Sequence, residues 1–147
     1  PFVTRIERSG LQTTQNRDFV DGPEGLPLMK PPYGRVTAIS MDTGEHLWVA
    51  PIGRGYESTS AISQLTFDDY LGGPQRIFSM ITKNLLITGQ QRLSAFNLDT
   101  GNRVGEVSIP DTVQGNLMAY ELNDKVYLVI TIGGSGTKSE LIAYTLN

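Results

Sequence analysis

The 147-residue chain contains no cysteine, one histidine and one tryptophan. The absence of cysteine excludes a disulfide framework, thiolate metal sites and a cysteine nucleophile, although it does not identify a cellular compartment. Acidic and basic residues nearly balance, at 15 against 12, and no basic stripe is interleaved with aromatic residues. We therefore expect no nucleic-acid partner. The longest apolar run, Val126 to Ile132, is too short to span a bilayer.

The chain also lacks any stretch with sustained 3.6-residue hydrophobic periodicity. It has sixteen glycines, eight prolines and short runs rich in Val, Ile, Leu, Thr and Tyr, bounded by turn-forming residues. These features are typical of β-strands, and 39% hydrophobic residues suffice for a globular core. The sequence thus indicates an all-β fold. The predicted strands are Arg35–Met41, Leu47–Ile52, Ile77–Thr82, Leu85–Thr88, Arg92–Leu98, Val104–Ile109, Leu117–Leu122, Val126–Ile132 and Glu140–Leu146.

The first 34 residues lack this pattern. Residues 1–18 are polar without regular alternation, and Asp21–Gly34 holds four prolines and three glycines. We therefore predict an irregular N-terminal segment over residues 1–34 and the strands over residues 35–147. A second long connection is expected over residues 53–75.

An internal repeat organises the strands. The stretch AISMDTG at 38–44 returns as AFNLDTG at 95–101, and a weaker third copy places Leu141–Leu146 on Leu93–Leu98. Each Asp-Thr-Gly corner predicts a turn in which Asp42 or Asp99 accepts hydrogen bonds from nearby backbone N–H groups. The glycine would then supply a positive φ. Asn123-Asp124 predicts a further hairpin turn.

Multi-stranded repeats of about 40–50 residues indicate a β-propeller, whose sheets, called blades, surround a common axis. Closed propellers have roughly four to eight blades. Three repeats therefore predict a partial β-propeller of about three blades, and we expect the chain to be a piece of a longer protein.

The repeat resembles the pattern Ala-x-Asp-x-x-Thr-Gly-x-x-x-Trp, the blade-docking motif of the pyrroloquinoline-quinone (PQQ) dependent dehydrogenases, which are eight-bladed quinoproteins. Both copies depart from it at the Asp position, and the second also departs at the Trp position. The matching residues are Ala38, Thr43, Gly44 and Trp48 in the first copy, with Ser40 for Asp, and Ala95, Thr100 and Gly101 in the second, with Asn97 for Asp and Gly105 for Trp.

Three further landmarks resemble the C-terminal region of the glucose-dehydrogenase-like branch of this family. In chain order they are KPPYG at 30–34, LGGP at 71–74, and MAY at 118–120 with KVYLVI at 125–130 before Gly133-Gly134. The resemblance covers roughly residues 24–147. It implies that Trp48 stacks on the neighbouring blade and that its indole N–H finds a backbone acceptor. Gly105 then marks either a remodelled contact or a degenerate copy.

The same resemblance implies PQQ and a calcium ion as cofactors, whose ligands, like the base Asp, belong to blades outside this chain. From this portion the family supplies two loops over the cofactor. They correspond to Leu71, Gly72 and Gly73, and to Gly133 and Gly134, and glycine lets backbone approach a flat ring closely. Leu71 and Ser135 stand where related alcohol dehydrogenases have tryptophans.

The implied activity is oxidation of a sugar or alcohol hydroxyl, with electrons passing to a respiratory quinone or cytochrome. The partners would include the remaining propeller blades. A periplasmic location is implied, with membrane attachment through a missing N-terminal part left open. Two alternatives remain: a non-catalytic propeller that serves as a scaffold or binding module, and a relative that has lost PQQ.

Other signals have simpler interpretations. Asp68-Asp69 lacks the alternating oxygen ligands of a calcium loop. His46 is the only histidine of the chain and belongs to the repeat, so a catalytic triad built on it is improbable. The stretch GGSGTK at 133–138 lacks both the glycine before lysine and the following helix of a phosphate loop. Lys30 is interpreted as a solvated loop residue. We expect neither a catalytic nor a metal-ligating residue in this chain.

Overall fold

The computed structural model describes residues 2–9, 12–19, 22–55, 71–73, 75–134 and 138–146. This part of the chain is built from strands and one short 3-10 helix, Pro23–Gly25. No helix in it is long and apolar enough to cross a membrane. The strands are β1 (Phe2–Ser9), β2 (Gln12–Phe19), β3 (Arg35–Ile39), β4 (His46–Pro51), β5 (Phe78–Ile81), β6 (Leu85–Gly89), β7 (Arg92–Asn97), β8 (Arg103–Ser108), β9 (Met118–Leu122), β10 (Lys125–Ile132) and β11 (Glu140–Leu146).

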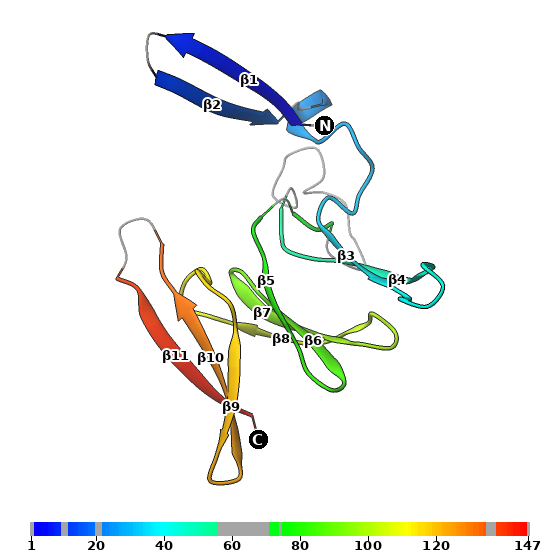
Figure 1. Cartoon of the computed structure of the whole chain (residues 1–147), viewed down its shortest axis with the longest axis vertical. Helices are drawn as coiled ribbons and strands as arrows, with labels where there is room; N and C mark the ends of the chain where they lie inside the picture. The colour runs from blue at the N-terminus through cyan, green and yellow to red at the C-terminus, as the bar shows by residue number, and fades with distance from the viewer. Residues whose placement is uncertain are drawn as a thin grey trace.

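Antiparallel pairing joins consecutive strands into separate sheets (Figure 1). One sheet is a complete four-stranded meander in the order β5-β6-β7-β8. We call it the second blade, because the β3-β4 pair precedes it as the first blade and β9-β10-β11 follows it as the third. One complete blade between two incomplete ones agrees with the predicted partial β-propeller.

The two faces of the second blade pack into two different hydrophobic cores. Side chains alternate along a strand, so Leu86 of β6 faces the first blade and Ile87 faces the third. Burial of both faces explains why β6 has three consecutive apolar residues, Leu85, Leu86 and Ile87. The core toward the first blade contains Ala50, Leu86 and Phe96, with Val36, Trp48 and Leu98 packed against it. The core toward the third blade contains Ile87, Leu93, Val113, Leu117, Leu128, Ile130 and Ile132.

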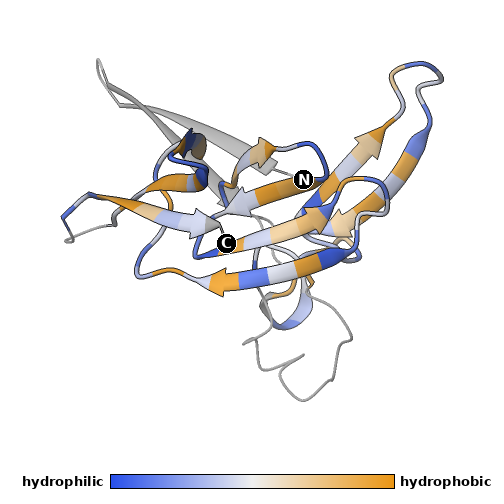
Figure 2. Cartoon of the chain, turned by 90° about the horizontal axis from the view of Figure 1, so that it is seen from below, coloured by the Kyte–Doolittle hydropathy of each residue, from blue (hydrophilic) through white to orange (hydrophobic). Residues whose placement is uncertain are grey.

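The hydropathy of the chain follows this arrangement. Figure 2 shows hydrophobic residues along the strands, whereas the turns that join them are largely hydrophilic. In β10, Leu128, Ile130 and Ile132 are buried, while Tyr127 and Val129 on the other face are half-buried. The continuous apolar run therefore reflects one fully buried face and one partly covered face.

The prediction of an irregular segment over residues 1–34 is wrong for its first part. Strands β1 and β2 form an antiparallel pair whose register runs from Phe2 opposite Phe19 to Ser9 opposite Gln12. Backbone hydrogen bonds alone define such a ladder, so it needs no alternation of apolar and polar residues. The β-branched and aromatic content of the segment is compatible with a strand. The later part, apart from the 3-10 helix and an isolated bridge residue, is irregular as expected.

The nine predicted strands correspond to β3 through β11, with ends that agree to within two residues. The predicted turn at Asn123-Asp124 is also confirmed, since both residues have positive φ, 51° and 59°. The connection over residues 53–75 contains no strand in the parts that are described, 53–55, 71–73 and 75. Asp68, Asp69 and Pro74 lie outside the described residues.

Candidate functional site

The two copies of the repeat have the same backbone geometry. Ala38 pairs with Trp48 across β3 and β4, and Ala95 pairs with Gly105 across β7 and β8. In both pairs the register shifts by one residue directly after the alanine. The corner glycines, Gly44 and Gly101, have φ values of 74° and 73°. The sequence repeat is therefore a structural repeat, and the predicted positive φ is confirmed.

The side chain that caps each corner is not the one we expected. In the second copy, Asn97 Oδ1 accepts from the backbone N–H groups of Asp99 and Thr100, both at 2.9 Å. In the first copy, Ser40 Oγ accepts from the Thr43 N–H at 3.2 Å. The acceptor thus stands two residues before Asp99, because the chain there leaves the strand and its side chain points back over the turn. The acceptor role predicted for the aspartates is corrected accordingly.

Trp48 joins the first blade to the second. Its indole Nε1–H donates to the backbone carbonyl of Leu98 at 2.8 Å. The ring lies against Gly101, where an added Cβ would be only 2.6 Å from two ring atoms. The implied stacking of this tryptophan on the neighbouring blade, with a backbone acceptor for its N–H, is therefore present. Glycine is therefore required at position 101 both by the positive φ and by the contact with the Trp48 ring.

The predicted cofactor segment Leu71–Gly73 is buried and precedes β5, the first strand of the second blade. Its backbone lies between two other segments, because the Tyr33 N–H donates to Leu71 O at 2.7 Å and the Gly73 N–H donates to Ile52 O at 3.1 Å. The Ile52 N–H in turn donates to Gly34 O at 3.0 Å. These bonds hold the segment in a fixed position relative to β4.

Three glycines make this close approach possible. A Cβ on Gly72 would lie 2.1 Å from Gly34 O, and a Cβ on Gly34 would lie 2.1 Å from Gly73 O. Gly72 also has a φ of 72°. No side chain fits at such distances to backbone atoms, so backbone packing by itself requires glycine at Gly72 and Gly34. A cofactor contact at Gly73 would use a backbone that is already positioned.

A cavity of about 350 Å³ opens beside this segment, between β3 and the inner strands β5 and β6. Its lining includes Gly73, Arg35, Tyr33, Gln75 and Ser79. Its volume lies at the lower end of the range for small-molecule sites, about 300–1,000 Å³. Among the described residues, the buried Oε1 of Gln75 has no hydrogen-bond partner. This oxygen packs against the backbone of Gly73 and Gly53, where an added Cβ would lie 2.1 Å and 2.9 Å from it.

Gly133 and Gly134 follow β10 in the third blade. The Gly133 N–H donates to Thr112 O at 2.9 Å, and Gly133 O accepts from the Gln114 side-chain amide at 2.7 Å. Gly133 is buried and Gly134 is exposed. The contacts that fix this pair thus involve different segments from those around Gly72 and Gly73. The role of either pair in cofactor binding stays a prediction.

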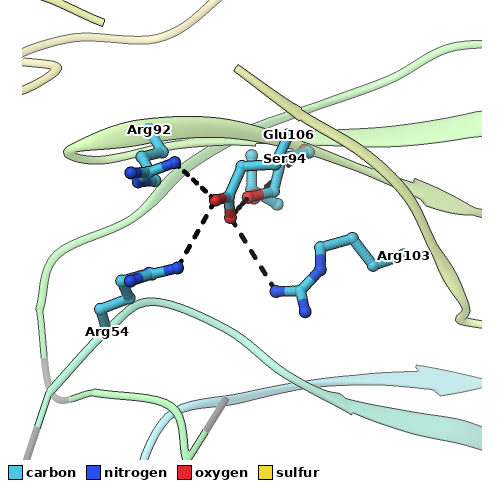
Figure 3. Close-up of polar contacts among 6 residues, drawn as sticks. Arg54, Arg92, Ser94, Arg103 and Glu106 are labelled. Carbon is cyan, nitrogen blue, oxygen red and sulfur yellow. Dashed lines mark hydrogen bonds and ion pairs between the residues drawn. The ribbon is translucent and has the colours of Figure 1, made fainter. Parts of the chain in front are cut away.

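A charged cluster connects the segment after β4 to the second blade (Figure 3). The Glu106 carboxylate, with its side chain 15% exposed, accepts from Arg92 Nη1 at 2.9 Å and from Ser94 Oγ at 3.2 Å. It also forms ion pairs with Arg54 Nη2 at 3.7 Å and Arg103 Nη1 at 3.9 Å. Arg54 follows the first blade, so this carboxylate stabilises the contact between two blades.

Four residues behind the weaker sequence signals lie at the surface of the described part of the chain. His46, Asp42, Asp99 and Lys30 are exposed. Within the described ranges no group of three or more His, Asp or Glu residues could hold a metal ion. Of GGSGTK at 133–138, residues 135–137 lie outside the described part, as does the Asp68-Asp69 pair.

The sequence reasoning missed the Glu106 cluster and the close packing of Gly34. The cluster follows from strand register, because once Ala95 is opposite Gly105, Ser94 must be opposite Glu106. An alignment of the two repeats therefore predicts that Ser94 and Glu106 are neighbours. Gly34 was recognised as part of a landmark, but only the contact with Gly73 explains why it is glycine.

Comparison with known proteins agrees with the motifs. The family model of the PQQ-type glucose/ethanol/alcohol dehydrogenase β-propeller domain matches residues 4–128. Quinoprotein glucose dehydrogenase A of Acinetobacter calcoaceticus is 33% identical over 133 residues, which cover 84% of this chain and 16% of that protein. The quinate/shikimate dehydrogenase (quinone) of Acinetobacter baylyi is 30% identical over 151 residues, covering 96% and 19%. The glycerol dehydrogenase large subunit of Gluconobacter thailandicus is 29% identical over 138 residues, covering 87% and 19%. The chain spans less than a fifth of each of these relatives.

Proposed function

Because the chain belongs to the glucose/ethanol/alcohol dehydrogenase β-propeller family, we propose that it is the C-terminal segment of a PQQ-dependent oxidoreductase. The substrate is a sugar or alcohol, whose hydroxyl-bearing carbon is oxidised to a carbonyl with loss of two electrons and two protons. The electrons pass to a respiratory quinone or cytochrome. The names of the relatives support this class, since glucose, quinate, shikimate and glycerol all carry secondary or anomeric hydroxyl groups.

The observation that carries the proposal is the cavity beside Gly73. PQQ is a flat tricarboxylate, and the cavity combines a glycine backbone with the cationic side chain of Arg35. These residues fit such a molecule, because glycine admits a flat ring and the guanidinium pairs with a carboxylate. When bound, PQQ supplies the two-electron redox chemistry.

The residues of this chain have a binding and positioning role in the proposal. The bonds from Tyr33 and to Ile52 fix Leu71–Gly73, so that one wall of the cavity is rigid before a ligand arrives. A preformed wall lowers the entropic cost of binding. The base that removes the hydroxyl proton and the calcium ligands belong to other blades. A periplasmic location is part of the same proposal.

The test compares PQQ binding by the intact protein and two variants. Arg35→Gln should weaken PQQ binding about tenfold, because it removes a charge from the cavity wall. Lys83→Gln is the matched control, since Lys83 is an exposed cation in the turn between β5 and β6. Its PQQ affinity should stay within about twofold of the wild type. Equal affinities in all three proteins would contradict the assignment of this cavity.

A second measurement addresses the activity. The intact protein with PQQ and calcium should reduce a dye in the presence of glucose, quinate or glycerol, whereas residues 1–147 alone should not. Absence of PQQ binding by the intact protein would instead favour a relative that has lost the cofactor. Turnover by residues 1–147 alone would refute the placement of the catalytic base outside this chain.

A further inference from the structure

The segment 112–114, between β8 and β9, lies antiparallel to the end of β10. Its Gln114 N–H donates to Thr131 O at 2.8 Å, and its Thr112 O accepts from the Gly133 N–H at 2.9 Å. These are the two bonds that flank a bridge between antiparallel strands. The segment therefore acts as a short extra strand where β10 ends.

The side chain of Val113 anchors this segment. It is 2% exposed and belongs to the core toward the third blade. The Val113 N–H donates to Gln90 O, in the turn between β6 and β7, at 2.7 Å. Gly89 leaves room for this contact, since an added Cβ there would lie 3.0 Å from the Val113 side chain. A buried side chain and a backbone bond thus hold the segment in place before any ligand arrives.

The antiparallel ladder ends at Gly133, where a side chain replaces the next backbone bond. In a regular ladder the Thr112 N–H would donate to Gly133 O. It donates instead to Asp111 Oδ1 at 2.6 Å. Gly133 O accepts from Gln114 Nε2 at 2.7 Å. The Gln114 amide therefore sets the orientation of the peptide group between Gly133 and Gly134, which no Cβ on either residue restricts.

The orientation of this peptide group also sets the direction of the Gly134 N–H. The carbonyl and the N–H of a planar trans peptide point in opposite directions, so the Gly134 N–H points away from Gln114. Gly134 is exposed, and its N–H donates to no other described residue. A backbone N–H of fixed direction that is left over in this way is a ready donor for an acceptor oxygen.

The pair Gly133-Gly134 lies at the same end of the blades as the cofactor segment Leu71–Gly73. That segment precedes β5, whose first residue, Phe78, pairs with Gly89 beside the turn between β6 and β7. The same turn is bonded to segment 112–114, which in turn holds the glycine pair. Both predicted cofactor segments therefore lie at the end of the blades that carries this turn.

We propose that Gln114 is a positioning residue, which holds the Gly134 N–H toward an acceptor oxygen of the bound cofactor. This inference rests on the proposed function, since PQQ offers quinone and carboxylate oxygens of this kind. The oxygen would gain a hydrogen bond from a donor that needs no reorganisation, which is the advantage of a preformed site. In this role Gln114 acts through the peptide group and does not contact the cofactor.

Matched variants separate this role from the general stability of the segment. Gln114→Met keeps the length of the side chain and removes its N–H donor. Gln114→Lys restores an N–H donor of similar reach. Asn116→Leu is the control, because it replaces another exposed amide of the same connection by an apolar side chain of similar size.

Single-residue hydrogen exchange of the intact protein tests the positioning, with and without PQQ and calcium. Without PQQ, Gln114→Met should speed exchange of the Gly133 amide about tenfold, whereas Gln114→Lys and Asn116→Leu should stay within about twofold of the wild type. Addition of PQQ should slow exchange of the Gly134 amide about tenfold in the wild type and much less in Gln114→Met. Titration with PQQ should show about tenfold weaker binding by Gln114→Met and, within about twofold, unchanged binding by Asn116→Leu.

The outcomes distinguish this inference from the proposed function. PQQ binding without slower exchange at Gly134 overturns the role of Gln114, and so does unchanged exchange at Gly133 in Gln114→Met. Absence of PQQ binding by the wild type contradicts the proposed function, and the ligand assigned to the Gly134 N–H with it.

Discussion

Replacing Gly101 by alanine should destabilise the protein more than the same replacement at Gly44, although both glycines have nearly the same φ. Alanine in the left-handed region costs about 1–2 kcal/mol at either position. At Gly44 nothing lies within 4 Å of the new Cβ, so this backbone term is the whole effect. Gly44→Ala is therefore the internal reference for the strain alone.

At Gly101 the new Cβ would lie 2.6 Å from two ring atoms of Trp48. Relieving that overlap requires the indole to shift, which strains its 2.8 Å hydrogen bond to Leu98 O. Overpacking of this kind costs about 1–3 kcal/mol. We therefore expect Gly101→Ala to lower the free energy of unfolding by about 2–5 kcal/mol in total.

A double-mutant cycle separates the two contributions. Trp48→Ala removes the ring, so in that background Gly101→Ala should cost only the strain measured at Gly44. Denaturant unfolding of the wild type, the three single variants and the double variant gives all the values. The expected coupling energy between positions 48 and 101 is about 1–3 kcal/mol. Its sign is that of a repulsion, because Gly101→Ala costs less once the tryptophan ring is gone. Equal costs of Gly101→Ala with and without the tryptophan would refute the reasoning.

Two smaller predictions concern the corner and the charged cluster. Asn97→Ala should lower the free energy of unfolding by about 1–2 kcal/mol, because Asn97 Oδ1 accepts two backbone hydrogen bonds. Ser40→Ala should cost about half as much, because Ser40 Oγ accepts one such bond. Equal losses for the two variants in thermal unfolding would contradict this account of capping. Glu106→Gln should cost about 1–2 kcal/mol at low salt and less in about 1 M NaCl, because it leaves Arg54, Arg92 and Arg103 near one another without the carboxylate charge. Arg76→Gln is the control, because it removes a charge that lies over the Phe78 ring outside this cluster. If the loss of stability in Glu106→Gln does not change with salt, charge is not its cause.

The strands of the blades were predictable because their signal is local. Runs of β-branched and apolar residues bounded by glycine or asparagine identified β3 through β11, and the repeated corner identified how β3 relates to β7. The pair β1 and β2 was missed since a ladder between backbones leaves little trace in the hydropathy of its residues. The residue that caps each corner was also misassigned, because the choice between Asn97 and Asp99 depends on side-chain direction.

The candidate site was less predictable. The motif identified Gly72 and Gly73 as a pair, but only the packed backbone shows that Gly34 shares their contact. The cavity beside Gly73 joins residues from β3, β5 and β6, and its volume depends on how two blades stand against each other.

The sequence by itself determined the all-β class, the repeat, the place of its turns and the family, because these depend on residue type and spacing along the chain. The tertiary structure decided which glycines touch backbone, which side of each strand faces which core, and where open space remains between blades. Contacts of that kind join residues far apart in the chain. Their geometry is set by the packing of whole sheets, which no short stretch of sequence contains.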